Sequence, residues 1–128
     1  MQRMPNKNEE IQRNKLLHTV IDGIQEVKGH EIVCLNLTEV PHAAADYFVI
    51  CHGTSDTQVN AIARAVEKET MDELRERPWH KEGQNNSEWV LLDYFNVVVH
   101  IFHKEARNFY ELEDMWADAE VQKIENRA

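Results

Sequence analysis

Apolar residues recur along the first half of the chain in three patterns, each typical of one kind of element. Residues 9–28 place apolar side chains three and four positions apart, which predicts a helix that Asn8 caps and Gly29 ends. Residues 31–37 alternate between apolar and polar, and residues 47–51 form a continuous apolar run. Both stretches are typical of β-strands, so the first half predicts one helix followed by two strands.

The second half of the chain repeats the same plan. Ser55 and Gln58 have the spacing of a helix capping box, and the helical apolar pattern that follows is closed by Pro78. The remaining expected elements are a polar loop over 81–87, strands over 89–93 and 97–102 that form a hairpin, and a final helix over 105–125.

The resulting order, αββαββα, predicts an α/β fold with a mixed sheet flanked by helices. A strand that passes directly into a helix near residues 51–58 favours a crossover connection and hence a partly parallel sheet. The length of 128 residues fits one domain, expected over residues 9–128. Residues 1–8 are polar and are expected to form a flexible N-terminal tail.

The charge balance restricts the class of partner. Asp and Glu number 23 against 14 Lys and Arg, which gives a net charge of −9. Such a chain is expected to be repelled by DNA and by naked RNA, and to fit a basic protein better. Apolar signal or membrane segments are not evident, so a cytoplasmic location is expected, without membrane contact. Cys34 and Cys51 lie in apolar runs, which predicts two buried thiols.

Several residues invite a chemical role, and each has a simpler explanation. The segment Gly53–Asp56 follows a strand and precedes a helix, but a single glycine is a weak signal for a phosphate loop. Glu67 and Glu69 lie on an expected helix, which points them to different sides and prevents them from sharing a metal ion. His100 and His103 fall on opposite faces of a strand. No catalytic residue, metal or cofactor is therefore expected.

Aromatic residues are concentrated in the second half of the chain. Trp89 begins a strand after a polar loop, and Tyr94 lies in the expected hairpin turn. Tryptophan and tyrosine are favoured anchors of protein interfaces. The pattern alone leaves open whether these two side chains belong to the core or to an exposed surface.

Together these residues resemble the ribosomal silencing factor family, also called Iojap-like proteins. The resemblance rests on the joint order and spacing of short motifs over about 85 residues rather than on any single one. The motifs are Lys28-Gly29, Asp46, Gly53-Thr54-Ser55, Gly83, Trp89, Asp93, Val97 to Val99 with His100, and Arg107 with Tyr110 to Glu113 and Trp116.

The resemblance implies a regulator of translation rather than an enzyme. It implies binding to the large ribosomal subunit through its fourteenth protein, a steric block to joining of the small subunit, and repression of translation when nutrients are scarce. It also implies a nucleotidyltransferase-like fold that lacks the metal-binding carboxylates, and the formation of homodimers. An acidic surface suits a basic ribosomal protein.

The partner-binding residues follow from the same resemblance. Trp89 matches the family's tryptophan at the ribosomal contact, and Tyr94 occupies an apolar hairpin position of that contact. Leu91 joins them by alternation along the strand, and Phe102 and Tyr110 join from the neighbouring strand and the final helix.

The chain departs from the family in the hairpin, where Phe95 replaces a common glycine. A positive φ is unfavourable for phenylalanine, so Asn96 is expected to take the left-handed position unless the turn differs. Two other functions stay open: a nucleotide-handling enzyme acting near Gly53–Asp56, and an adaptor for a different basic protein.

Overall fold

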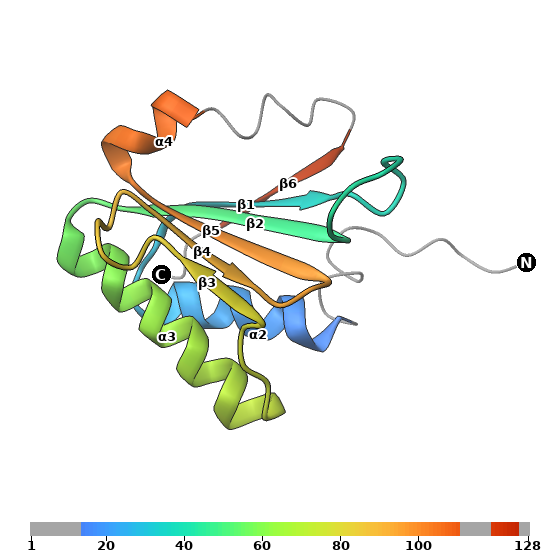
Figure 1. Cartoon of the computed structure of the whole chain (residues 1–128), viewed down its shortest axis with the longest axis horizontal. Helices are drawn as coiled ribbons and strands as arrows, with labels where there is room; N and C mark the ends of the chain where they lie inside the picture. Colours follow the sequence, from blue (N-terminus) through green and yellow to red (C-terminus); the bar gives the residue numbers. More distant parts are fainter. Residues whose placement is uncertain (1–13, 111–118, 126–128) are drawn as a thin grey trace, which may run out of the picture.

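The protein folds into a mixed sheet with helices on both faces (Figure 1). The structure is a computed structural model and describes residues 14–110 and 119–125. The tail expected over residues 1–8 and the cap expected at Asn8 lie outside the described residues. In chain order the elements are α2 (Lys15–Glu26), β1 (His30–Asn36), β2 (Tyr47–Gly53), α3 (Asp56–Leu74), β3 (His80–Glu82), β4 (Trp89–Asp93), β5 (Val97–His103), α4 (Lys104–Tyr110) and β6 (Glu120–Ile124).

The sheet has six strands in the order β3-β4-β5-β2-β1-β6. β2 and β5 pair in parallel at its centre, and every other neighbouring pair is antiparallel. The parallel pair requires a crossover, which α3 begins directly after β2. The partly parallel α/β sheet expected from the sequence is therefore confirmed.

Two apolar layers cover the two faces of the sheet. Figure 1 shows α2 and α3 on one side and α4 on the other. The layer beneath α2 and α3 is built by alternate strand residues such as Val49 and Val99, and by helix residues such as Ile24 and Ile62. The opposite layer contains Val33, Leu35, Leu37, Ala45, Phe48, Ile50, Val98, Phe102 and Ala106. Because both faces of β2 and β5 are covered, these central strands are almost continuously apolar.

The helix ends show which residues cap them. Ser55 caps α3 by accepting a hydrogen bond from the Gln58 amide at 3.1 Å, as the sequence predicts. Asn14 caps α2 through its side chain, 3.0 Å from the Leu17 amide. The expected ends differ: α2 ends before Lys28, which takes a φ of +58°, and α3 ends at Leu74, ahead of Pro78.

Two expectations for the secondary structure are wrong. Part of the expected polar loop forms β3, which is exposed along its whole length and pairs with β4. The expected final helix does not extend over Glu120–Ile124, because that segment is β6 and pairs with β1 at the edge of the sheet. In both cases the hydrogen bonds offered by an open sheet edge outweigh local sequence pattern. The expected course of residues 111–118 lies outside the described residues.

The hairpin turn also differs from expectation. Phe95 itself takes the positive φ, +77°, and Asn96 does not. The Asp93 carboxylate accepts a hydrogen bond from the Phe95 amide at 2.8 Å. This local bond offsets part of the cost of placing a bulky residue in that conformation.

Candidate partner-binding surface

Trp89 and Leu91 lie on one face of β4, as strand alternation predicts. Both are partly buried and pack against the apolar layer opposite α2 and α3. Trp89 pairs with Phe102 across β4 and β5, and their rings stack with centroids 5.1 Å apart and planes 27° apart. Trp89, Leu91 and Phe102 therefore form one cluster.

His100 holds the Trp89 ring from the middle of β5. The Trp89 Nε1–H group donates a hydrogen bond to His100 Nδ1 at 3.1 Å. Since Nδ1 accepts, the neutral ring carries its proton on Nε2. Burial lowers the pKa of His100 to about 4, so the ring is neutral at pH 7.

The Nε2 atom of His100 is buried and has no hydrogen-bond partner within residues 14–110 and 119–125. The ring lies among aromatic side chains instead, with Phe48 edge-on at 4.6 Å. The Trp89 bond is thus the polar contact that orients this histidine in the described part of the chain.

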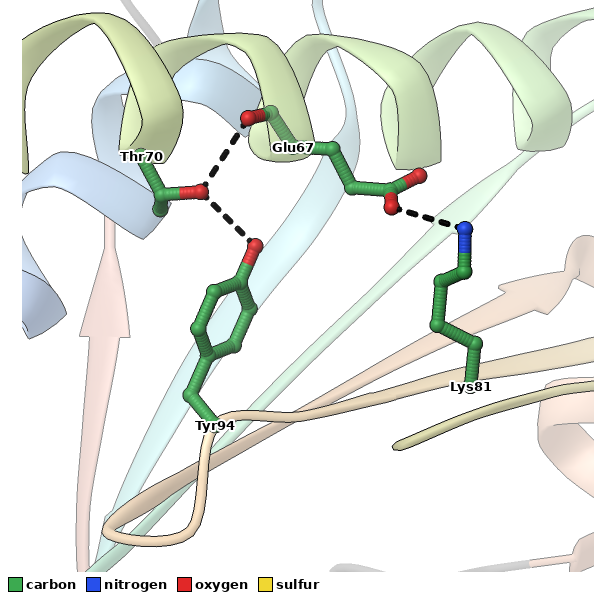
Figure 2. Close-up of polar contacts among 4 residues, drawn as sticks. All are labelled: Glu67, Thr70, Lys81 and Tyr94. Carbon is green, nitrogen blue, oxygen red and sulfur yellow. Dashed lines mark hydrogen bonds and ion pairs between the residues drawn. The ribbon is translucent and has the colours of Figure 1, made fainter. Parts of the chain in front are cut away.

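Phe102 and Tyr94 are both buried, so neither is available as a direct contact for a partner. Phe102 is only 1% exposed, so it supports Trp89 from below. Tyr94 is 7% exposed and packs in the layer beneath α2 and α3, on the opposite side of the sheet from the Trp89 cluster. Figure 2 shows its hydroxyl directed at Thr70 of α3, 2.9 Å away. The expectation that Tyr94 shares a surface with Trp89 is therefore wrong.

Tyr110 ends α4, and its side chain lies outside the described residues. Arg107 anchors α4 and is 8% exposed. Its guanidinium donates to the Glu31 carbonyl at 2.7 Å and lies 3.0 Å from His52 Nδ1. Desolvation, and then the Arg107 charge, lower the pKa of His52 to about 4.

An acidic hollow adjoins the Trp89 end of β4. It has a volume of about 380 Å³ and lies where β5 ends and α3 and α4 begin. Its lining includes three carboxylates, those of Asp56, Glu88 and Glu105. Glu88 directly precedes Trp89, and its carbonyl accepts a hydrogen bond from the His103 amide at 2.9 Å. The three carboxylates therefore gather at the end of the sheet where β4 begins with Trp89.

The segment Gly53–Asp56 forms a turn and a helix cap. Gln58 Oε1 accepts from the Thr54 amide at 2.8 Å, and Ser55 caps α3, so these polar groups are satisfied within the chain. Glu67 and Glu69 lie on α3, and Glu67 pairs with Lys81 at 3.0 Å. Within the described ranges, no group of three or more His, Cys, Asp or Glu side chains is arranged to hold a metal ion.

The two thiols lie inside the fold. Cys34 and Cys51 are buried and both carry thiols, as the sequence predicts. Burial raises the pKa of Cys51 to about 12, which leaves its thiol protonated and unreactive.

One exposed aromatic feature is not predicted from the sequence pattern. Trp79 is 78% exposed and Phe95 is 67% exposed, although neither was singled out as a surface anchor. The sequence does contain a signal for the exposure of Trp79. This residue directly follows Pro78 in a charged stretch that has few apolar residues to pack against it.

These observations define an α/β protein with an aromatic and acidic surface at one end of β4. The sequence profile of the family described as "Ribosomal silencing factor during starvation" matches residues 9–128. The chain belongs to this family, which confirms the resemblance noted from its motifs.

Individual relatives agree with this assignment. A ribosomal silencing factor from Halalkalibacterium halodurans is 36% identical over 115 residues, covering 90% of this chain and 97% of that protein. One from Bacillus subtilis is also 36% identical, covering 90% and 96%. A crystal structure of a Chromobacterium violaceum protein has a TM-score of 0.76 at 25% identity, covering 89% and 91%. The described helices include none long and apolar enough to cross a membrane.

Proposed function

We propose that this protein is a cytoplasmic, non-enzymatic repressor of translation that binds the large ribosomal subunit through its fourteenth protein. In the bound state it occupies space that the small subunit needs, and it thereby blocks subunit joining when nutrients are limiting. Family membership supports the ribosomal role. We assign the binding surface to the Trp89 cluster, formed by Trp89, Leu91 and Phe102, because this cluster lies beside the acidic hollow.

The chemistry of this surface suits a basic protein. Tryptophan is a frequent energetic centre of protein interfaces, and its truncation there costs about 2 kcal/mol or more. Trp89 is fixed by Phe102 and His100 before the partner arrives, so little side-chain freedom is lost on binding. The carboxylates of Glu88 and Glu105 attract a cationic partner and mainly raise the rate of association.

The burial of each side chain indicates which residues of this surface can touch the partner. Trp89 and Leu91 touch the partner directly, and Phe102 supports them. We place Tyr110 at the border of this surface, because α4 begins on the same side of the sheet as Trp89. Tyr94 is not part of the proposed contact, because it lies on the opposite side of the sheet.

The deciding experiment mixes the protein with isolated large and small ribosomal subunits and separates the mixture on a sucrose gradient. We expect comigration with the large subunit and fewer joined ribosomes at a magnesium concentration that permits joining. Trp89→Ala should weaken binding about 30-fold, as a loss of about 2 kcal/mol implies, and Glu88→Gln should weaken it much less.

Controls separate binding from folding and from self-association. Val121→Ala changes an apolar side chain of β6, which is far from β4 in the strand order, and should bind as the unmodified chain does. The protein alone should also be sedimented, because a mass of twice 15.0 kDa would establish the homodimer. A protein that stays at the top of the gradient and leaves joining unchanged would contradict the proposal.

A further inference from the structure

Trp79 and Phe95 form an exposed aromatic pair from two separate segments. Trp79 lies between α3 and β3, and Phe95 lies in the turn between β4 and β5. Their ring centroids are 6.0 Å apart, with planes at 82°. They are 78% and 67% exposed, and the next most exposed large apolar side chain in the described ranges is Val121 at 40%.

Asp93 holds both aromatic residues in place. Its carbonyl accepts a hydrogen bond from the Trp79 amide at 2.6 Å, and its carboxylate accepts one from the Phe95 amide at 2.8 Å. Phe95 has a φ of +77°, a conformation that costs a bulky residue about 1–3 kcal/mol. The chain therefore maintains an exposed aromatic ring in a strained turn, which is characteristic of a functional position.

A basic hollow of about 470 Å³ lies beside this pair, between α3 and β3. Pro78, which directly precedes Trp79, is part of its wall. The cations of the hollow outnumber its carboxylates, although the whole chain has a net charge of −9. Its lining residues are Arg64, Glu67, Lys68, Met71, Arg77, Pro78 and Lys81.

The four cations are not equivalent. Lys68 pairs with Asp72 at 2.6 Å, and Lys81 pairs with Glu67 at 3.0 Å, as Figure 2 shows for the second pair. Arg64 and Arg77 are exposed and have no ion-pair partner among the described residues. Two guanidinium groups are therefore available for an anionic ligand.

We infer that Trp79, Phe95 and the basic hollow form a contact surface for single-stranded RNA. Bases stack on exposed aromatic rings with little dependence on sequence, and arginine side chains bind the phosphates between them. An acidic protein segment would engage the arginines but has no base to stack on the rings. The combination of free guanidinium groups and exposed rings therefore favours RNA.

This inference rests on the proposed function, because the ribosome supplies the RNA. The net charge of −9 opposes RNA binding by the chain as a whole, so the contact is weak alone. Trp89 begins β4 and Phe95 lies in the turn after its other end, so the two residues are at most about 20 Å apart at about 3.4 Å per residue. Attachment through Trp89 raises the local RNA concentration at the second surface, which lets a weak contact add to binding.

The test is fluorescence anisotropy with a labelled 12-nucleotide uridine oligomer at 50 mM and 200 mM KCl. We expect binding at the lower salt and much weaker binding at the higher salt. The Trp79→Ala, Phe95→Gly double variant should bind at least about tenfold more weakly, because one stacked base contributes about 1–3 kcal/mol. Arg64→Gln with Arg77→Gln should weaken binding and reduce the salt dependence.

The variants are chosen to keep the fold intact. Phe95→Gly keeps the turn and relieves its strain, because glycine adopts a positive φ readily, and Trp79 is largely exposed. Val121→Ala is the matched control for loss of an exposed apolar side chain, and it should bind the oligomer normally. Trp89→Ala should weaken large-subunit binding about 30-fold and leave oligomer binding unchanged, which separates this inference from the proposed function.

Two results would overturn the inference. One is the absence of oligomer binding at 50 mM KCl by a protein that binds the large subunit. The other is oligomer binding that the aromatic and arginine variants leave unchanged. Binding of a polyglutamate peptide that depends on the arginines, without any oligomer binding, would assign the hollow to an acidic protein segment instead.

Discussion

The Trp89 indole donates a hydrogen bond to His100 across the β4–β5 pair, and the two rings lie 5.8 Å apart. The histidine is almost fully buried, and the tryptophan is partly exposed at the start of its strand. A buried polar residue thereby fixes the direction of the aromatic side chain that we assign to the partner. This relationship makes His100 a positioning residue.

His100→Phe should weaken large-subunit binding while preserving the fold. Phenylalanine keeps the aromatic packing against Phe48 but removes the acceptor for Trp89 Nε1. A neutral hydrogen bond contributes about 0.5–1.5 kcal/mol, so the affinity should fall about 2- to 10-fold. Dissociation rates measured by surface plasmon resonance on immobilised large subunits provide the readout, and tryptophan emission should shift as well. His18→Phe on α2 is the control, and equal rates for both variants would contradict the role of His100.

The protein should lose stability as the pH falls from about 6.5 to about 4. Burial holds the pKa of His100 at about 4, against 6.5 in the unfolded chain. The unfolded chain therefore binds the additional proton over this range, and stability is fully present only above pH 6.5. At about 1.4 kcal/mol per pKa unit, the loss between pH 7.5 and pH 5.0 is about 2 kcal/mol for this group.

Urea unfolding at pH 7.5 and pH 5.0 measures this loss. His52 contributes in the same direction because desolvation and Arg107 lower its pKa too. In His100→Phe the loss of unfolding free energy between pH 7.5 and pH 5.0 should be smaller by the about 2 kcal/mol assigned to His100. The part of the loss that is due to His52 should remain. An identical pH dependence in the variant and the unmodified protein would show that His100 does not titrate in this way.

Tyr94→Phe should lower stability without affecting the ribosome. The variant removes the buried hydroxyl that lies 2.9 Å from Thr70 Oγ1, while Thr70 keeps its 3.2 Å bond to the Glu67 carbonyl (Figure 2). Loss of one such bond costs about 1 kcal/mol, which urea unfolding resolves. A fall in large-subunit affinity at unchanged stability would instead return Tyr94 to the contact surface.

Features of the structure that depend on a local sequence pattern could be predicted from the sequence. Trp89 and Leu91 share a face because side chains alternate along β4, and Ser55 caps α3 because its spacing to Gln58 matches that geometry. The same alternation, carried one residue past β4, places Tyr94 on the face of Val90 and Leu92, opposite Trp89, and Tyr94 packs on that side. Its assignment to the Trp89 surface came from the family resemblance alone.

Features decided by distant segments were not predictable in this way. β6 depends on the open edge of β1, and its exposed, mixed sequence has no strand signal of its own. The Trp79–Phe95 pair depends on Asp93, which binds the amides of both residues after the chain has folded. Such contacts follow from tertiary structure and leave little trace in local composition.

Gly83→Ala should disturb both the fold and the binding surface. Gly83 has a φ of +85°, and a Cβ atom there would lie 1.9 Å from the Trp89 carbonyl oxygen. The backbone at the start of β4 must therefore move, which should cost at least about 2 kcal/mol and displace the Trp89 side chain. Urea unfolding and gradient cosedimentation with large subunits should both detect the change.

Gln84→Ala, at the exposed neighbouring position, is the control and should leave both measurements unaltered, because its side chain does not lie against β4 in this way. A Gly83→Ala protein with full stability and full affinity would mean that the close approach of the loop to Trp89 is not needed to position the ring.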